Sequence, residues 1–387
     1  MLNLPTATVN ALKAGSWQAV NIIYSSILDD PDEGEEDVYI TEADIMQGGL
    51  SVNRQCPFGI GEAYAAELKL SLYNKNGKFN SVYFDKGQFS VKVATKDWNN
   101  QSAALQNVPL GKFYIDSAPR MGNVINISAI DRMILFDKVV TDWSAYTFPM
   151  TLANFVQVLC TLAGVTLTQP SSLNLLPNAT YTVYWGEHFD DVTLRTLLRW
   201  ASFLLASNAY MDWNGELLVH GFAYAPVFTI FQNTASERYV SDITNETISI
   251  TKLEYASSDG TKFSVGNNDG YILRYSGCEL LSHDEQTALT NILDSFQNLT
   301  FAVGSIELFP APFLWPMDSI LYQPNGICIP ITEISYTINR HTHLVCKYEG
   351  SRTNATVQPV EKNSGISLTE SDIIYIKKLI AQALANI

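Results

Sequence analysis

The feature that most constrains this chain is an alternation of apolar and polar residues that recurs in two separate stretches. Over Ala66–Leu72 every second residue is apolar, and Glu67, Lys69 and Ser71 occupy the positions between. Successive side chains of a strand point to opposite faces, so such a run is typical of a strand with one buried face. The same pattern predicts further strands at 17–24, 88–94, 124–130, 247–255, 329–338 and 342–348.

Between the two β-rich stretches the apolar residues follow the period of a helix. Leu152, Phe155, Val156 and Leu159 recur at helical spacing, with Thr151 as the expected N-cap and a glycine at 164 as the stop. A second helix is predicted over 191–207, and the Asn214-Gly215 turn is expected to open a hairpin into 216–222. A third helix is predicted after the run 282–285, interpreted as a capping box.

These patterns predict a mainly β (α+β) fold. We expect two tube-like β-barrel domains, a small α+β insertion and a C-terminal helix, divided as 1–140, 141–244, 245–350 and 351–387. In the last segment an a/d seam follows a polar linker and consists of Ile373, Ile376, Ile380, Ala383 and Ile387. Isoleucine at both a and d favours more than two strands, so the seam indicates a trimer. The alternative is a single amphipathic helix that docks on its own domain.

Charge and composition exclude several classes of protein. The 387 residues include 24 Lys and Arg against 39 Asp and Glu, a formal net charge of −15. Nucleic-acid readers neutralise phosphates with a basic surface, so a DNA-reading protein is not expected. Charged residues make up only 16% and aromatic residues 11%. Such a surface indicates contacts with other subunits, because interface cores lose charge and gain aromatic residues.

The cysteines and the termini carry no targeting or metal signal. The five cysteines at 56, 160, 278, 328 and 346 are widely spaced and form no CxxC, so they are expected to be small core residues. The first fifteen residues lack the apolar region of a secretory signal, and no run of 18 apolar residues predicts a membrane span.

Candidate catalytic and metal groups are few. His341 and His343 lie on one face of a predicted strand, as in some zinc sites, but no third ligand can be named. The run 185–191 places His188 among carboxylates, which could make a general base, although Asp190 and Asp191 are more simply explained as helix caps. Cys160 is the only nucleophile to consider beside it, and no motif supports it. We therefore predict no enzyme, no catalytic residue, no metal site and no cofactor.

The order of several short segments resembles the N-terminal part of phage tail hub proteins. This group includes tail-tip proteins often described as prophage tail endopeptidase or tail-associated lysin, and its layout is similar to the baseplate hubs of contractile tails. The segments that carry the resemblance, in order, are 39–45, 48–52, 58–61, 65–70, 111–116, Arg120, 124–133, 193–198, 212–217, 253–255 and 269–271, followed by a β-rich region that ends near Gly350.

The resemblance implies a structural protein of the virion. Two tube-like domains in one chain would let a homotrimer form a pseudo-hexameric ring that joins the tail tube to the tip and surrounds or closes the channel for DNA ejection. It implies distal tail protein, tail tube or baseplate subunits and tape-measure protein as partners, transient passage of DNA, and assembly in the host bacterial cytoplasm. Family members often carry an enzyme after the hub, whereas this chain stops at Ile387, so a hub without a lytic domain is expected.

Two other functions stay open from the residues alone. One is a tail-tip cell-wall hydrolase centred on His188 and nearby acids. The other is a receptor- or carbohydrate-binding tail module that uses exposed aromatic residues, for which Trp98, Trp143 and Trp315 are the candidates. If the hub surrounds a channel for DNA, we expect its wall to be acidic, because negative charge repels the phosphates of the passing duplex.

Overall fold

The structure is a computed structural model of the chain. It describes residues 18–26, 37–56, 58–84, 87–95, 106–222, 226–230, 247–297, 299–302, 304–308, 314–323, 326–337 and 342–346. None of the helices in these ranges is long and apolar enough to cross a membrane. The predicted C-terminal helix, with its seam from Ile373 to Ile387, lies outside the described residues, and so does Trp98.

The largest sheet combines strands from both β-rich stretches. Its order is β18-β22-β21-β3-β4-β8-β6-β5-β1-β2, with β7 paired to β8. The strands are β1 (Gln18–Ser26), β2 (Asp37–Thr41), β3 (Ile45–Gln55), β4 (Glu67–Tyr73), β5 (Gly87–Thr95), β6 (Gln106–Ser117), β7 (Arg120–Met121), β8 (Val124–Asp131), β18 (Gly304–Leu308), β21 (Glu333–Thr337) and β22 (Thr342–Cys346).

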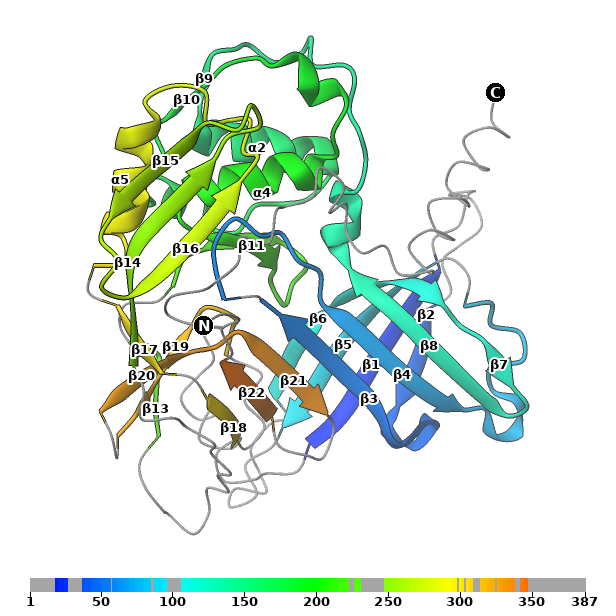
Figure 1. The fold of residues 1–387 in the computed structure, drawn as a ribbon. Coiled ribbons are helices and arrows are strands. Elements are labelled where there is room, and N and C mark those ends of the chain that lie inside the picture. The colour runs from blue at the N-terminus through cyan, green and yellow to red at the C-terminus, as the bar shows by residue number, and fades with distance from the viewer. Residues whose placement is uncertain are drawn as a thin grey trace.

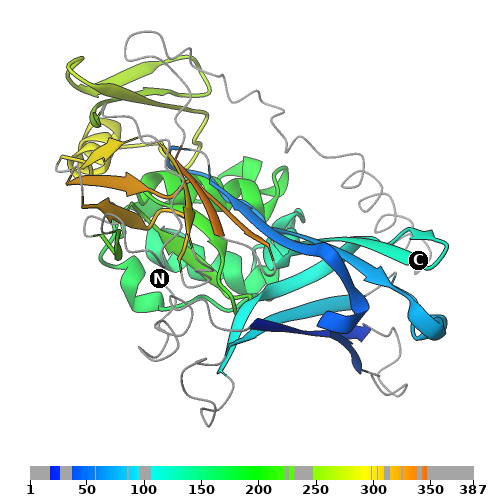
Figure 2. The same ribbon diagram turned by 90° about the horizontal axis from the view of Figure 1, so that it is seen from below.

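This sheet curls around its own apolar face. Figure 1 shows β3, β4 and β8 in front of β6, β5 and β1, and Figure 2 shows the same curl from below. Leu68, Leu70 and Leu72 of β4 are buried, as the alternation predicts, and they share one core with residues of β1, β3, β5, β6 and β8. The apolar face is therefore enclosed by the sheet that bears it.

Hydrogen bonding does not close the sheet into a ring. Among the described strands, pairing runs as an open path from β18 at one edge to β2 at the other. The mainly β fold is confirmed, but the closed barrels expected from the sequence are not found in the described part of the chain. The smaller sheets, described below, have two to four strands each and do not close either.

A helical module follows β8 and the turn η3 (Arg132–Phe136). It contains β9 (Met150–Thr151), α2 (Leu152–Ala163), α3 (Pro170–Leu173), β10 (Thr182–Val183), η4 (Glu187–Asp190), α4 (Leu194–Leu204), β11 (Asn208–Met211) and β12 (Leu217–His220). The predicted limits of α2 are confirmed, because the Thr151 hydroxyl accepts from the Asn154 amide at 3.3 Å and Gly164 ends the helix in the left-handed region. The predicted Asn214-Gly215 hairpin joins β11 to β12.

Two predicted helix starts are wrong. The N-cap of α4 is Thr193, whose side chain accepts from the Thr196 amide at 3.2 Å, so Asp190 and Asp191 do not cap it. The run before α5 (Glu285–Asp294) does not form a capping box, because Asp284 has φ of 50° and its side chain makes no cap hydrogen bond. The amides of Ser282 and His283 donate instead to the hydroxyl of Tyr181.

The remaining strands of the second β-rich stretch, together with β13 (Phe228–Ile230) from the segment before it, form two smaller sheets. One consists of β14 (Thr247–Ala256), β15 (Lys262–Gly266), β16 (Tyr271–Ser276) and β17 (Thr300–Ala302), with α5 packed on β15 and β14. The other consists of β13 (Phe228–Ile230), β19 (Ser319–Tyr322) and β20 (Ile327–Pro330). The single strand expected over 329–338 is wrong. It splits into β20 and β21, which belong to different sheets, because Ile331 between them bonds with the backbone of Met317 and Asp318.

Two hydrophobic cores organise the described residues. One lies inside the curled sheet, and the other joins α2, α4, α5 and the β14–β16 sheet. The pairing of β21 with β3 brings Tyr336 opposite Val52, although the two residues lie far apart in the sequence. The predicted domain boundaries at 140, 244 and 350 stay a prediction. The first and third of these segments contribute strands to one sheet.

Candidate functional site

The outer face of the curled sheet carries a mixture of uncharged polar and charged side chains, with apolar ones such as Ile23, Tyr114 and Ile130 between them. We call this the polar face. It alternates with the buried residues, and cross-strand pairing places its members side by side, as in Ser51–Lys69–Ser128 and Ser71–Asn126. The Ser71 hydroxyl donates to the Asn126 side chain at 2.9 Å. The uncharged polar members include Asn21, Ser25, Ser51, Asn53, Ser71, Gln88, Ser90, Asn126, Ser128 and Ser335, and the charged ones are Asp37, Glu67, Lys69, Lys92, Lys112, Asp116 and Glu333.

Charges on the polar face nearly cancel. Four carboxylates face three lysines, so the face holds little of the net charge of −15. The Ser, Asn and Gln side chains between them carry no net charge. Such a surface can border a water-filled space without attracting or strongly repelling a polyanion.

One end of the curled sheet exposes large apolar side chains. We call this the tip cluster: Tyr39, Tyr73, Tyr83 and Met121, which are 62%, 44%, 78% and 72% exposed. The segments that bear it are tied together by polar contacts. Lys78 donates to the Tyr39 carbonyl at 3.0 Å, and Arg120 donates to the carbonyls of Phe79 and Val82. A rigid cluster of exposed Tyr and Met is typical of a contact surface.

A buried arginine joins the two cores. Arg54 is only 3% exposed and lies at an inward position of β3. Its guanidinium donates to the carbonyls of Met211 at 2.7 Å and Leu110 at 3.2 Å. It stacks over Trp213 and Trp315, with 4.1 Å and 5.6 Å to the ring centroids. Arg54 therefore links the curled sheet to the helical module and to the chain before β19.

A buried carboxylate complements this arginine. Asp131 is 1% exposed, and its oxygens accept from the amides of Ala66 at 2.9 Å and Met133 at 3.0 Å. Burial raises its pKa to about 6, although the positive charge of Arg54 acts in the opposite direction. Burial lowers the pKa of Arg54, and the charge of Asp131 opposes that shift. Asp131 therefore holds the end of β8 to the segment before β4 and to the start of η3.

Among the side chains that the structure describes, the residues considered for hydrolysis do not form a catalytic centre. The side chain of His188 lies outside the described ones. Cys160 is 3% exposed on α2, and burial raises its pKa to about 12, which disfavours the thiolate. Cys160 therefore lies in the core, as expected for a small core residue. Trp185, at the start of the same run, packs against Trp143 and Phe148.

Metal binding has no support among the described side chains. His341 and the side chain of His343 lie outside the described residues, although the backbone at 343 belongs to β22. Within the described ranges, no three His, Cys, Asp or Glu side chains gather as metal ligands would.

The tryptophans considered for carbohydrate binding are buried where the structure describes them. Trp143 is 5% exposed and packs on Phe155, and Trp315 is 3% exposed beside Arg54. The expectation that these rings are exposed is wrong, because each fills a core that a distant part of the chain completes.

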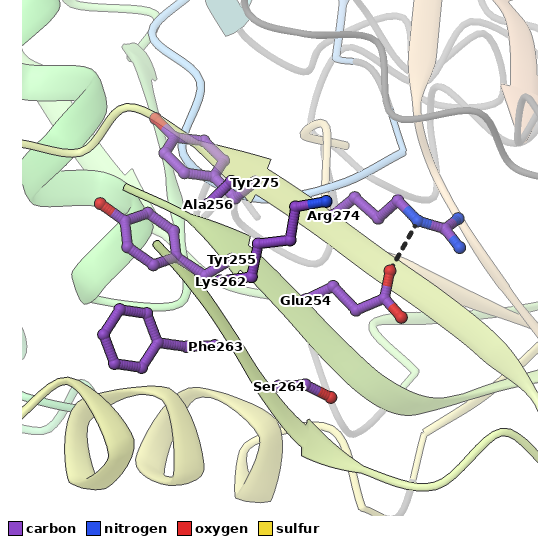
Figure 3. Close-up of a pocket in the computed structure, with 8 residues that line it drawn as sticks. All are labelled: Glu254, Tyr255, Ala256, Lys262, Phe263, Ser264, Arg274 and Tyr275. Carbon is purple, nitrogen blue, oxygen red and sulfur yellow. Dashed lines mark hydrogen bonds and ion pairs between the residues drawn. The ribbon is translucent and has the colours of Figure 1, made fainter. Parts of the chain in front are cut away.

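A hollow of about 340 Å³ lies on the β14–β15–β16 sheet (Figure 3). Glu254 in its wall accepts from Arg274 at 2.9 Å and forms an ion pair with Lys252 at 2.8 Å. The hydrogen bond from Lys252, followed by that from Arg274, lowers the pKa of Glu254. In Figure 3 Tyr255 and Phe263 point away from Glu254, on the other side of the sheet. The only carboxylate in the hollow is thus held ionised between two cations and is a poor general acid.

Sequence reasoning missed the buried pair and the tip cluster. For Arg54 a signal exists, because it continues the inward phase of Leu50 and Val52, where a charged residue needs a buried partner. For Tyr83 and Met121 there is none, because single apolar residues in turns carry no pattern.

No protein-family model and no curated protein sequence matches this chain. Among solved structures, the tail protein from Neisseria meningitidis MC58 is similar with a TM-score of 0.51 and 11% identity, covering 86% of this chain and 97% of that one. The 43 kDa tail protein of prophage MuSo2 from Shewanella oneidensis aligns with a TM-score of 0.47 and 11% identity, covering 84% and 97%. A chain of the Francisella PdpA-VgrG complex aligns with a TM-score of 0.43 and 10% identity, covering 85% and 52%.

The Neisseria tail protein shows the fold. Its alignment extends over nearly its whole length and most of this chain. The resemblance to tail proteins that the order of sequence segments indicates is therefore confirmed at the level of the fold, and this chain has the mainly β fold of a solved tail protein.

Proposed function

We propose that this chain is a structural hub of a phage tail or of a phage-tail-like particle. Three copies would form a pseudo-hexameric ring that joins the tail tube to the tip and surrounds or closes the channel for DNA ejection. The observation that carries this proposal is the fold shared with a solved tail protein over 97% of that protein's length.

The polar face is the surface we assign to the channel. It is the solvent side of the largest sheet, and its three lysines are nearly balanced by four carboxylates, so it offers a passing polyanion neither a net positive charge nor a strong opposing field. On this assignment the channel wall is nearly neutral rather than acidic, so the expectation of an acidic wall does not hold for this face. The net charge of −15 then lies elsewhere on the molecule.

We assign the tip cluster to contacts with the next component of the tail, such as tail tube, distal tail or baseplate subunits. Strand edges such as β2 suit contacts between copies around a ring, whereas strand ends face along the axis of a tube. A stiff group of exposed aromatic residues at a strand end fits an axial contact.

We also propose that the chain acts without catalysis, in the virion at the tail tip or baseplate. The ionised Glu254 is a poor general acid and the buried Cys160 is disfavoured as a thiolate nucleophile, and both observations support this view. A cell-wall hydrolase would instead clear a suspension of isolated cell walls and lose that activity in His188→Ala.

Sedimentation velocity of the full chain tests the hub. A trimer of about 129 kDa, three times the chain mass of 43.0 kDa, is expected, and particle images should show a ring with a central channel. A monomer that persists at tens of micromolar, and is unchanged by added tail-tube or distal-tail subunits, would contradict the proposal.

Two matched variants test the tip cluster. Met121→Asp should keep the trimer but reduce co-sedimentation with the neighbouring ring by about tenfold or more, because it places a charge in a contact core. Leu175→Asp is the control, since Leu175 is 87% exposed on a different part of the molecule. Equal co-sedimentation by both variants would remove the tip cluster from the axial contact.

A further inference from the structure

A second hollow, separate from the polar face and the tip cluster, lies between β10 and the first turns of α5. We call it the α5 pocket. Its volume is about 270 Å³, which suits a single ring-sized ligand. Eight of its nine lining side chains carry a polar group. The lining residues are Asn178, Thr180, Tyr181, Thr182, His283, Asp284, Thr287, Ala288 and Asn291.

The stacked rings of Tyr181 and His283 form one wall of the α5 pocket, and Tyr184 borders this wall through its contact with His283. The His283 ring stacks on Tyr181 with 4.3 Å between centroids, and Tyr184 meets it edge-on at 5.2 Å. The Tyr181 hydroxyl donates to the His283 carbonyl at 2.9 Å and accepts from two backbone amides, so the wall is held rigidly. Tyr184 does not line the pocket itself, but it contacts the lining residue His283 and is 55% exposed, so its ring is available to a ligand that extends beyond the pocket.

The floor of the pocket is also fixed before any ligand arrives. The Asn178 amide donates to the carbonyls of Leu204 at 2.9 Å and Ala288 at 3.0 Å, which ties α4 to α5. Asn291 donates to the Asn178 side-chain oxygen at 2.8 Å. A site that is already ordered loses little conformational entropy when it binds a ligand.

Polar groups remain for a ligand. The hydroxyls of Thr182 and Thr287 and the carboxylate of Asp284 make no hydrogen bond to another residue in the described part of the chain. A carboxylate accepts from two hydroxyl donors, and a threonine hydroxyl both donates and accepts. The groups match a ligand that carries several neighbouring hydroxyls.

We infer that the α5 pocket binds a neutral saccharide. A sugar ring has an apolar face, which suits the exposed ring of Tyr184 beside the pocket, and a rim of hydroxyls, which suits the threonines and Asp284 in the pocket lining. The nine lining residues include no lysine or arginine, so a phosphate or another anion is not the fitting ligand. Only Ala288 is purely apolar, so a lipid chain or an apolar peptide is not either.

The inference is independent of ring formation. A saccharide site on the helical module would let the protein touch a surface glycan whether it acts as one copy or three. The tryptophans considered from the sequence take no part, since Trp143 and Trp315 are buried.

Saturation-transfer NMR on the full chain tests the inference, with D-glucose, D-galactose and N-acetyl-D-glucosamine as probes. At least one probe should bind with a dissociation constant of about 1 mM, typical of a single small-ligand contact of this size. Tyr184→Ala should reduce the signal by about fivefold or more, and Asp284→Asn should reduce it as well. Tyr83→Ala is the matched control, because Tyr83 is 78% exposed on the tip cluster and should leave binding unchanged.

Three results would overturn the inference. One is no transfer to any of the three sugars at about 10 mM, a concentration that saturates a millimolar site. Another is an equal signal from the parent chain and Tyr184→Ala, with unchanged far-UV circular dichroism in both. The third is a change of oligomeric state in Tyr184→Ala without sugar binding by the parent chain, which would make this face a protein contact. A monomeric chain that binds sugar would leave the inference intact and contradict only the hub.

Discussion

Truncation of Arg54 should destabilise the junction between the two cores. The Arg54→Ala variant loses the hydrogen bonds at 2.7 Å and 3.2 Å to the carbonyls of Met211 and Leu110. A hydrogen bond from a charged donor contributes about 1.5–3 kcal/mol, and each carbonyl left buried without a partner adds a desolvation cost. The variant also loses the stacking on Trp213, at 4.1 Å to the ring centroid, which is worth up to about 2 kcal/mol when desolvated.

These contributions overlap. The substitution also removes the positive charge that favours the ionised form of the buried Asp131 carboxyl. The expected loss in the free energy of unfolding is about 3–5 kcal/mol, because two hydrogen bonds from a charged donor and the stacking on Trp213 are lost together. Urea unfolding followed by tryptophan fluorescence measures it, because two of the seven tryptophans flank the guanidinium.

Two variants control the measurement. Arg54→Lys keeps the charge but cannot reach both carbonyls or stack as a plane, so about 1–2 kcal/mol should be lost. Lys92→Ala removes an exposed cation from the polar face and should change the free energy of unfolding by less than about 0.5 kcal/mol. The reasoning is refuted if Arg54→Ala behaves like Lys92→Ala, or if Arg54→Lys costs as much as Arg54→Ala.

Two further predictions concern pH and close packing. Because burial raises the pKa of Asp131 to about 6, its contribution to stability is fully present below about pH 4 and is lost as the pH rises through 6. The stability advantage of the parent chain over Asp131→Asn should therefore shrink by about 3 kcal/mol between pH 4 and 7, measured as urea midpoints at both pH values, and a constant difference would contradict the argument. Gly61→Ala should cost about 2 kcal/mol or more, because the added Cβ would lie 2.5 Å from the Tyr275 ring at a φ of +83°. Gly260→Ala, at a φ of +89° with no atom within 4 Å, is its control and should cost about 1 kcal/mol, so equal losses in thermal unfolding would refute the packing argument.

The local elements of the fold were predictable because the residues that determine them are neighbours in the chain. Thr151 and Gly164 mark the ends of α2, and the alternation in β4 places its leucines in the core. Hydrogen bonds of caps and turns form within a few residues, so the sequence alone indicates them. The prediction fails where a distant group competes, as at α5, where the hydroxyl of Tyr181 replaces the expected capping box.

The candidate sites were predictable to a lesser extent. The polar face follows from the alternation, because the positions between the leucines must point to the other side of the strand. The tip cluster and the α5 pocket do not, because each combines residues from segments that are far apart in the chain. The buried Trp143 and Trp315 show the same limit, since the sequence cannot tell whether an aromatic ring faces solvent or a core completed elsewhere.

The sequence by itself therefore determined the strands, the helices of the middle segment and the mainly β class, all of which depend on periodicity and short-range hydrogen bonds. Only the tertiary structure decided that the sheet stays open, that β21 pairs with β3, and that Arg54 stacks beside Trp213 and Trp315. Those outcomes depend on which apolar faces meet when the whole chain is compact. Many pairings bury similar area, and no run of neighbouring residues selects among them.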